Sequence, residues 1–184
     1  MASGWEALAL FDSPRERAVT QGIRVLDTLE EPASDELVAK VVDALDLIAA
    51  VDPRRMKRLR LDVDAIMLIE WSASRRIAAH MPRSRSCYIR IGAARTYSVC
   101  TLATIIAHEG THARLDRLRV VAWWGALQHR MEHRCLREEL AIAERLPKSH
   151  CPDTEAWIAG RATTSRFASK PSRARQDARR VRAT

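Results

Sequence analysis

Residues 108 to 112 have the types and spacing of a metal site, because His108-Glu109-Gly110-Thr111-His112 is an HExxH sequence. On a helix, residues i and i+4 lie one above the other, so His108 and His112 can bind one metal ion. Glu109 then reaches a water molecule on that ion rather than the ion itself. The spacing predicts a Zn2+ site with two histidine ligands and Glu109 as the general base. The alternative is a helix with two solvated histidines and a surface glutamate.

A helix from residue 99 to 118 is expected to carry this motif. Ser98 or Thr101 can cap its start, and no proline interrupts it. Apolar residues recur along it at steps of three and four, namely Leu102, Ile105, Ile106, Leu115 and Leu118. Both histidines should therefore lie on the same side of one continuous helix.

A second helix is predicted from residue 123 to 146, ended by Pro147. One stripe of it combines Glu132, Cys135 and Glu139 with apolar residues. Burying unpaired carboxylates is costly, and a metal ion would explain one of them. His129 and His133 fall off this stripe and are expected to be solvated.

A catalytic zinc site takes three protein ligands and leaves a fourth position for water. If the two helices fold back at residues 120 to 121, the midpoint between the histidines faces Glu132. Glu139 lies roughly 10 Å further along the helix. We therefore expect Glu132 as the third ligand, with Glu139 as the alternative ligand or as the group that orients a histidine.

The HExxH sequence followed by a glutamate on the next helix resembles the gluzincin group of zinc metallopeptidases, and in size its small members, the minigluzincins. The run from Ile106 to Leu115 is also similar to a "HExTHARL" core of bacterial proteins. The similarity spans residues 65 to 147, and the gluzincin aspartate four residues past the ligand glutamate is replaced by Leu136. The resemblance implies a small zincin-like domain that hydrolyses a peptide or protein substrate. Candidates for the oxyanion donor are Tyr88, Tyr97 and His150, by their chemistry alone.

The fold class expected is α+β, mainly helical, with a short antiparallel sheet before the HExxH helix. Helical patterns are predicted for residues 5–30, weakly, and for residues 34–52, where Ser34 is the N-cap. A basic turn at 54–58 and an alternating segment at 59–63 follow. Strands are predicted at 65–71 and 87–92, separated by a short helix around 75–80. Residues 87–92 are the candidate sheet edge for binding an extended peptide by strand addition, with an ordinary core strand as the alternative.

The length of this 184-residue chain favours a single domain, expected at residues 1–160. The four cysteines show no CxxC pair, so free thiols in a reducing compartment are expected. The first residues include Glu6 within an apolar run and make a poor signal peptide, and the apolar stretches are too short to cross a membrane. These features favour a cytoplasmic protein.

The formal net charge of +8 is concentrated at the end of the chain. Residues 161–184 contain eight Lys or Arg and one Asp, and their composition predicts a disordered tail. Such a tail can bind nucleic acid with strongly salt-dependent affinity, although a solvated appendage is the commoner role. The alternative to a hydrolase is a non-catalytic regulatory or interaction module with a vestigial metal site and this basic tail. No feature of the sequence assigns an oligomeric state.

Overall fold

The computed structural model describes residues 14–29, 33–70, 76–120, 125–147 and 151–168. Its strands are β1 (Arg15–Thr20), β2 (Ile23–Asp27), β3 (Ala65–Ile69), β4 (Ala78–Met81) and β5 (Ser86–Arg90). Its helices are α1 (Asp35–Val51), α2 (Pro53–Asp62), α3 (Ile91–Thr96), α4 (Val99–Arg117), α5 (Gly125–Ala143) and α6 (Pro152–Ala168), with a short 3-10 turn η2 (Pro82–Ser84). The α+β class expected from the sequence is confirmed for these residues.

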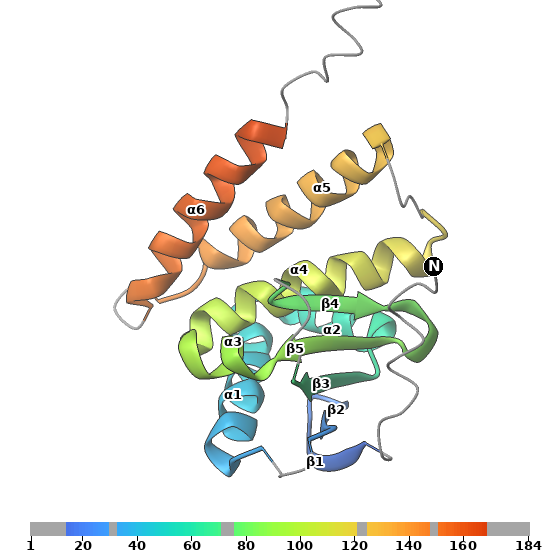
Figure 1. Ribbon diagram of the computed structural model, residues 1–184, viewed down its shortest axis with the longest axis vertical. Coiled ribbons are helices and arrows are strands. Elements are labelled where there is room, and N and C mark those ends of the chain that lie inside the picture. Colours follow the sequence, from blue (N-terminus) through green and yellow to red (C-terminus); the bar gives the residue numbers. More distant parts are fainter. Residues whose placement is uncertain (1–13, 30–32, 71–75, 121–124, 148–150, 169–184) are drawn as a thin grey trace, which may run out of the picture.

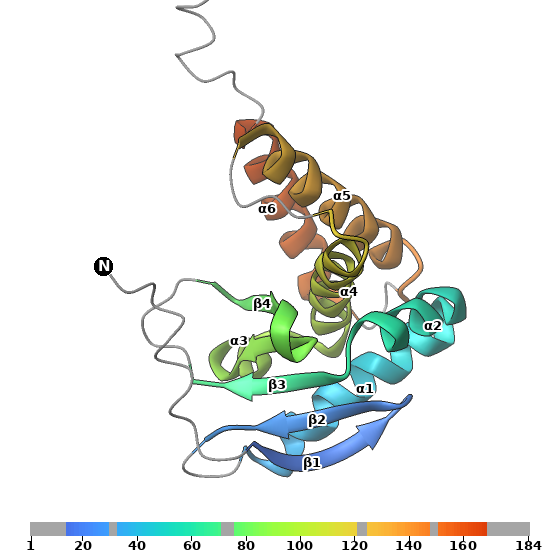
Figure 2. The ribbon, with the colours of Figure 1, turned by 90° about the vertical axis from the view of Figure 1, so that its right-hand side faces the viewer.

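The elements form layers, with α4 between the sheet and the pair α5 and α6 (Figures 1 and 2). The main core joins strands to helices and includes Leu68 and Ile89 from the sheet with Leu45 and Ile106 from α1 and α4. Among the described residues, a small apolar cluster around Met67 lies on the opposite face of the sheet. This arrangement buries α4 and leaves its far side to α5 and α6.

An N-terminal hairpin of β1 and β2 stands where a weak helical pattern was predicted for residues 5–30. That prediction was wrong for residues 15–27, and residues 5–13 lie outside the described residues. Gln21 and Gly22 have φ of 51° and 74°, as a two-residue hairpin turn with two left-handed residues requires. Val25 is fully buried and pairs with Ile66 of β3, so tertiary pairing outweighs the local helical pattern.

The sheet is mixed, with strand order β1-β2-β3-β5-β4, rather than the small antiparallel sheet that was predicted. β3 runs parallel to β2 and to β5, and β4 pairs antiparallel with β5. Residues 78–81 are a strand rather than part of a short helix. Consequently residues 87–92 do not provide the sheet edge, since β5 lies inside the sheet and β4 covers it.

Helix α1 confirms the prediction for residues 34–52, and the Ser34 hydroxyl accepts a bond from the Leu37 amide at 3.4 Å. Residues 54–62 continue as α2 instead of forming a turn and an alternating segment. Asp52 caps this helix and Pro53 stands at its start, which favours helix initiation. The basic residues of this segment therefore lie on an amphipathic helix.

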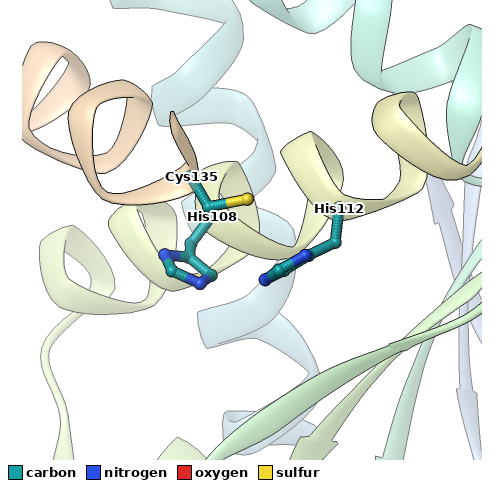
Figure 3. Close-up of side chains that lie close together, drawn as sticks. All are labelled: His108, His112 and Cys135. Carbon is teal, nitrogen blue, oxygen red and sulfur yellow. The ribbon is translucent and has the colours of Figure 1, made fainter. Parts of the chain in front are cut away.

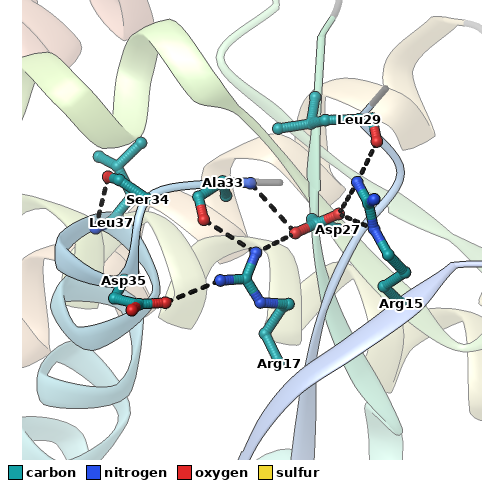
Figure 4. Close-up of polar contacts among 8 residues, drawn as sticks. All are labelled: Arg15, Arg17, Asp27, Leu29, Ala33, Ser34, Asp35 and Leu37. Carbon is teal, nitrogen blue, oxygen red and sulfur yellow. Dashed lines mark hydrogen bonds and ion pairs between the residues drawn. The ribbon is translucent and has the colours of Figure 1, made fainter. Parts of the chain in front are cut away.

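A buried carboxylate fastens the hairpin to the start of α1 (Figure 4). Asp27 is fully buried and accepts bonds from Arg15 Nε at 3.1 Å, Arg17 Nη1 at 2.6 Å and the Ala33 amide at 3.2 Å. Burial raises the pKa of Asp27, but the two guanidinium groups outweigh burial and lower it overall. Arg17 also reaches Asp35 at 2.8 Å, so this network positions α1 against the sheet.

Candidate metal centre

Helix α4 forms where it was predicted. The Ser98 hydroxyl accepts a bond from the Thr101 amide at 3.2 Å and caps its first turn. His108 and His112 lie on one side of the helix, with ring centroids 5.0 Å apart. The His108 side chain is 6% exposed and that of His112 is 21% exposed. The i, i+4 spacing therefore places both imidazoles together, as expected.

Helix α5 packs on α4 and runs antiparallel to it (Figure 1). It begins at Gly125, and Trp123 and Trp124 of the predicted helix lie outside the described residues. His129 and His133 are exposed, as predicted. The opposite side of α5 brings three side chains toward the two histidines, Glu132, Cys135 and Glu139.

Glu132 lies between the two imidazoles. Its Oε2 is 3.6 Å from Nε2 of His108 and its Oε1 is 3.5 Å from Nε2 of His112. These imidazoles lower the pKa of Glu132. Half of the Glu132 side chain is exposed, so this position is open to solvent.

Glu139 contacts the other nitrogen of His108. Its Oε2 lies 2.8 Å from His108 Nδ1, and its side chain is 1% exposed. Trp157 of α6 donates to Glu139 Oε1 at 2.5 Å. Glu139 therefore fixes the orientation of the His108 ring and leaves Nε2 facing Glu132.

The charges of these carboxylates act on His108. Burial lowers the pKa of this imidazole, but Glu132 and Glu139 outweigh burial and raise it to about 9. Burial alone would raise the pKa of Glu139, but its hydrogen bond to His108 lowers it overall. Without a metal, the His108 imidazole is therefore protonated at neutral pH and lies between two ionised carboxylates.

Cys135 belongs to the same cluster (Figure 3). It is a fully buried free thiol, and ligand atoms of His108, His112 and Cys135 all lie within 4.8 Å of one another. This group could hold a metal ion. Burial and the nearby carboxylates raise the pKa of the Cys135 thiol, and a bound cation would favour its thiolate. The sequence placed Cys135 on the correct stripe but did not indicate it as a ligand.

Glu109 lies on the sheet side of the motif. It is 9% exposed, and its negative charge adds to burial in raising the pKa of Cys87 on β5. Glu109 also interacts electrostatically with His80 of β4. The His80 side chain is 6% exposed, and its Nε2 lies 3.7 Å from Asp116. Neither ring nitrogen of His80 has a hydrogen-bond partner among the described residues. Sequence reasoning missed His80 because it expected a helix there.

Helix α6 supplies contacts that the sequence did not predict. The helix runs to Ala168, past residue 161, where the basic tail was predicted to begin. Arg161 Nη2 lies 3.2 Å from Nδ1 and 3.4 Å from Nε2 of His108. Its guanidinium also lies over the Trp157 ring, 5.6 Å from the centroid. No local sequence signal indicates that Arg161 or Trp157 lies near His108.

A disulfide joins Cys100 of α4 to Cys151 before α6, with Cα atoms 5.6 Å apart. The prediction of free thiols is wrong for this pair, whereas Cys87 and Cys135 are free. Only two of the four cysteines are therefore free thiols of the kind expected in a reducing compartment.

Two of the candidate oxyanion donors, Tyr88 and Tyr97, lie in the described part of the chain, and the contacts of their rings are with groups other than the two histidines. Tyr97 packs its ring on Trp157 at 5.0 Å, and Tyr88 joins the apolar cluster on the other face of the sheet. His150 lies outside the described residues. None of the helices in the described part of the chain has the length and hydrophobicity needed to cross a membrane.

Comparisons of this chain with protein families, curated proteins and solved structures return no match.

Proposed function

We propose that the chain is a zinc-dependent hydrolase, most simply a metallopeptidase of gluzincin type. The observation that carries this proposal is the position of Glu132, whose oxygens lie 3.6 and 3.5 Å from the Nε2 atoms of the two HExxH histidines. Two imidazoles and one carboxylate are the ligand set of many hydrolytic zinc sites. Glu139 on His108 Nδ1 supplies the carboxylate that usually orients such a histidine.

The donor chemistry fits Zn2+. His108, His112 and Glu132 would hold the ion, and a bound zinc would polarise a carbonyl and lower the pKa of water. Glu109 would accept the proton of the attacking water at its carboxylate and deliver it to the leaving amine. Its place beside the histidines, on the sheet side of α4, supports this role.

The sheet supports a peptide or protein as the substrate and a zincin-like arrangement. β4 is the edge strand next to α4, it runs antiparallel to β5, and its outer side pairs with no described strand. An extended peptide along β4 would gain main-chain hydrogen bonds that tolerate many sequences. The edge predicted at residues 87–92 is thus replaced by residues 78–81.

A cytoplasmic location is part of this proposal, and the Cys100–Cys151 disulfide is the feature that opposes it, since disulfides are rare in reducing compartments. Alkylation of the thiols in freshly lysed cells, followed by mass spectrometry, decides the point. Four alkylated cysteines support the cytoplasm, and a protected pair of Cys100 and Cys151 contradicts it.

The test of the hydrolase is Glu109→Gln in zinc-loaded protein, with unfolded casein as the probe substrate. The wild-type chain is expected to cleave casein, and the variant is expected to keep one zinc by emission spectrometry while losing at least about 100-fold in rate. Turnover that survives in Glu109→Gln would remove the base assignment. His112→Ala is the companion variant, and unchanged zinc content there would refute the ligand assignment.

The second candidate is a non-catalytic module with a closed metal site. Cys135 supports it, because a thiolate added to His108, His112 and Glu132 would complete four ligands and leave no position for water. Cobalt substitution discriminates the two. A thiolate-to-cobalt charge-transfer band that disappears in Cys135→Ser supports the closed site, and its absence from wild-type protein supports the open, catalytic site.

A further inference from the structure

Arg161 brings a guanidinium close to Nε2 of His108, the nitrogen that would face the metal. Its Nη2 lies 3.4 Å from His108 Nε2, and Glu132 approaches this same nitrogen to 3.6 Å. The Arg161 side chain is 35% exposed. The Arg161 side chain is therefore partly open to solvent beside the metal-facing side of His108.

The position of Arg161 is fixed by the anchoring of α6. The Cys100–Cys151 disulfide joins the starts of α4 and α6, and Asp153 accepts from the Ser98 amide at 2.9 Å. Further along α6, Trp157 binds Glu139 and its ring faces the guanidinium. These contacts hold the cation near the histidines before any ligand arrives, which reduces the entropy lost on binding.

Among the described residues, the contacts of Arg161 leave its Nε donor without a partner. Its contact with Glu139 is long, at 3.4 Å, and that carboxylate already receives His108 at 2.8 Å and Trp157 at 2.5 Å. The Nε atom of Arg161 is buried and has no hydrogen-bond partner among the described residues. A guanidinium with free donors matches the planar geometry of a carboxylate.

We propose that Arg161 binds a carboxylate of the substrate beside His108, so that the centre prefers peptides with a negative group next to the bond to be cleaved. The inference deepens the proposed hydrolase function and rests on it. The carboxylate can come from a free C-terminus or from an acidic side chain.

The first experiment uses acetate as the probe and cobalt-loaded protein, with the visible spectrum as the readout. Arg161→Gln is expected to weaken acetate binding by about tenfold or more, as loss of a charge-assisted hydrogen bond predicts. Arg161→Lys, which keeps the charge, should recover part of the affinity. Arg137→Gln, which removes an exposed arginine from α5, is the matched control for net charge and should leave acetate affinity unchanged.

If Arg161 only supports the metal site through its contact with Glu139, Arg161→Gln should lower cobalt affinity and not acetate affinity. Trp157→Phe removes the donor to Glu139 but keeps Arg161 and an aromatic ring beside it, so it is expected to lower cobalt affinity and to weaken acetate binding far less than Arg161→Gln does. If Arg161→Gln behaves in the same way, the proposal is overturned. If the wild-type chain binds no cobalt, the proposed hydrolase and this inference both fail. Cobalt binding with equal acetate affinity in wild type and Arg161→Gln overturns this inference alone.

The source of the carboxylate is found with peptides bound to zinc-loaded Glu109→Gln protein, measured by calorimetry. Tetra-alanine and its C-terminal amide test the chain terminus, and acetyl-Ala-Glu-Ala-amide and its glutamine counterpart test a side chain. Adding Arg161→Gln is expected to weaken the binding of one of the two carboxylate-bearing peptides by about tenfold. It should leave the binding of the amide and glutamine counterparts unchanged. The proposal is contradicted if Arg161→Gln lowers the affinity for each carboxylate-bearing peptide and for its counterpart equally, or lowers no affinity.

Discussion

Glu132 and Glu139 lie seven residues apart on α5 and contact different nitrogens of His108. Because a zinc ligand contributes directly to binding, Glu132→Gln is expected to lower zinc affinity by more than 100-fold. Glu139→Gln removes only the orientation of the ring, which usually changes affinity by about 10- to 100-fold. Competition with a chromophoric chelator measures both, with circular dichroism as the folding control. A larger loss in Glu139→Gln than in Glu132→Gln would reverse the two assignments.

Zinc affinity should depend steeply on pH because His108 is protonated in the metal-free protein. Its pKa is raised from 6.5 to about 9, and zinc binds the neutral imidazole. Below pH about 9 each ion must displace this proton, so affinity is expected to rise about tenfold per pH unit from pH 7 and to level off near 9. Calorimetry in buffers of different ionisation enthalpy should detect the released proton. A flat affinity between pH 7 and 9 would contradict the charge state inferred for His108.

The same shift predicts how the metal-free protein responds to pH. Because the folded pKa of His108 is above the unfolded value of 6.5, its protonated form stabilises the fold fully below pH about 6.5. That contribution is lost as the pH rises through about 9. Zinc replaces the proton, so alkaline pH should destabilise the metal-free form more than the loaded form.

At the residue scale, the sequence predicted what one helix or one helical hairpin can determine. The spacing of His108 and His112 defines a shared side, and the fold-back of α5 brings Glu132 to them. His80 and Arg161 could not be predicted in this way, since β4 and α6 meet α4 only through tertiary packing.

At the scale of elements, Gly110 allows α2 to pack closely on α4. A Cβ at this position would lie 2.3 Å from Cδ1 of Leu59, which is 4% exposed and has little room to move. Gly110→Ala is therefore expected to destabilise the protein by about 1–3 kcal/mol, as overpacking does. Thermal and urea unfolding of the metal-free protein measure the effect.

Gly160 provides the matched control for this prediction. It lies within helix α6, and an added Cβ there meets no atom within 4 Å. Gly160→Ala is expected to be neutral or to stabilise by up to about 1 kcal/mol, because alanine favours a helix. Equal effects of the two substitutions would show that contact with Leu59 is not the cause.

Elements with strong internal patterns were predicted well, and elements defined by pairing were not. The apolar stripe and caps of α1 and α4 follow from 3.6-residue periodicity, and β3 from its short apolar run. β1, β2 and β4 are short strands whose hydrogen-bond partners lie elsewhere in the chain, so local periodicity carries little information about them. The parallel register of β3 with β5 also depends on the segment between them, which the sequence interpretation treated as helix.

At the scale of the whole molecule, the boundary expected at residue 161 falls within α6. The spacing of the four cysteines gives no reason to join Cys100 to Cys151, 51 residues apart, rather than any other two. This connection makes α6 part of the candidate metal centre rather than the start of an appendage. The basic segment that remains after α6 is residues 169–184, with six Lys or Arg and one Asp.

Deleting residues 169–184 separates the role of this basic segment from that of the metal centre. The truncated chain retains Arg161 and all of α6, so its zinc and acetate affinities are expected to match those of the full chain. Its affinity for a single-stranded DNA oligonucleotide should fall, and the full chain should show a slope of log affinity against log salt of up to about −4, since six cations displace counterions at about 0.7 each. Deletion of residues 161–184 is the contrasting variant and should lose acetate affinity as well. Salt-dependent DNA binding that is unchanged by removing residues 169–184 would place the polyanion site within the folded part of the chain.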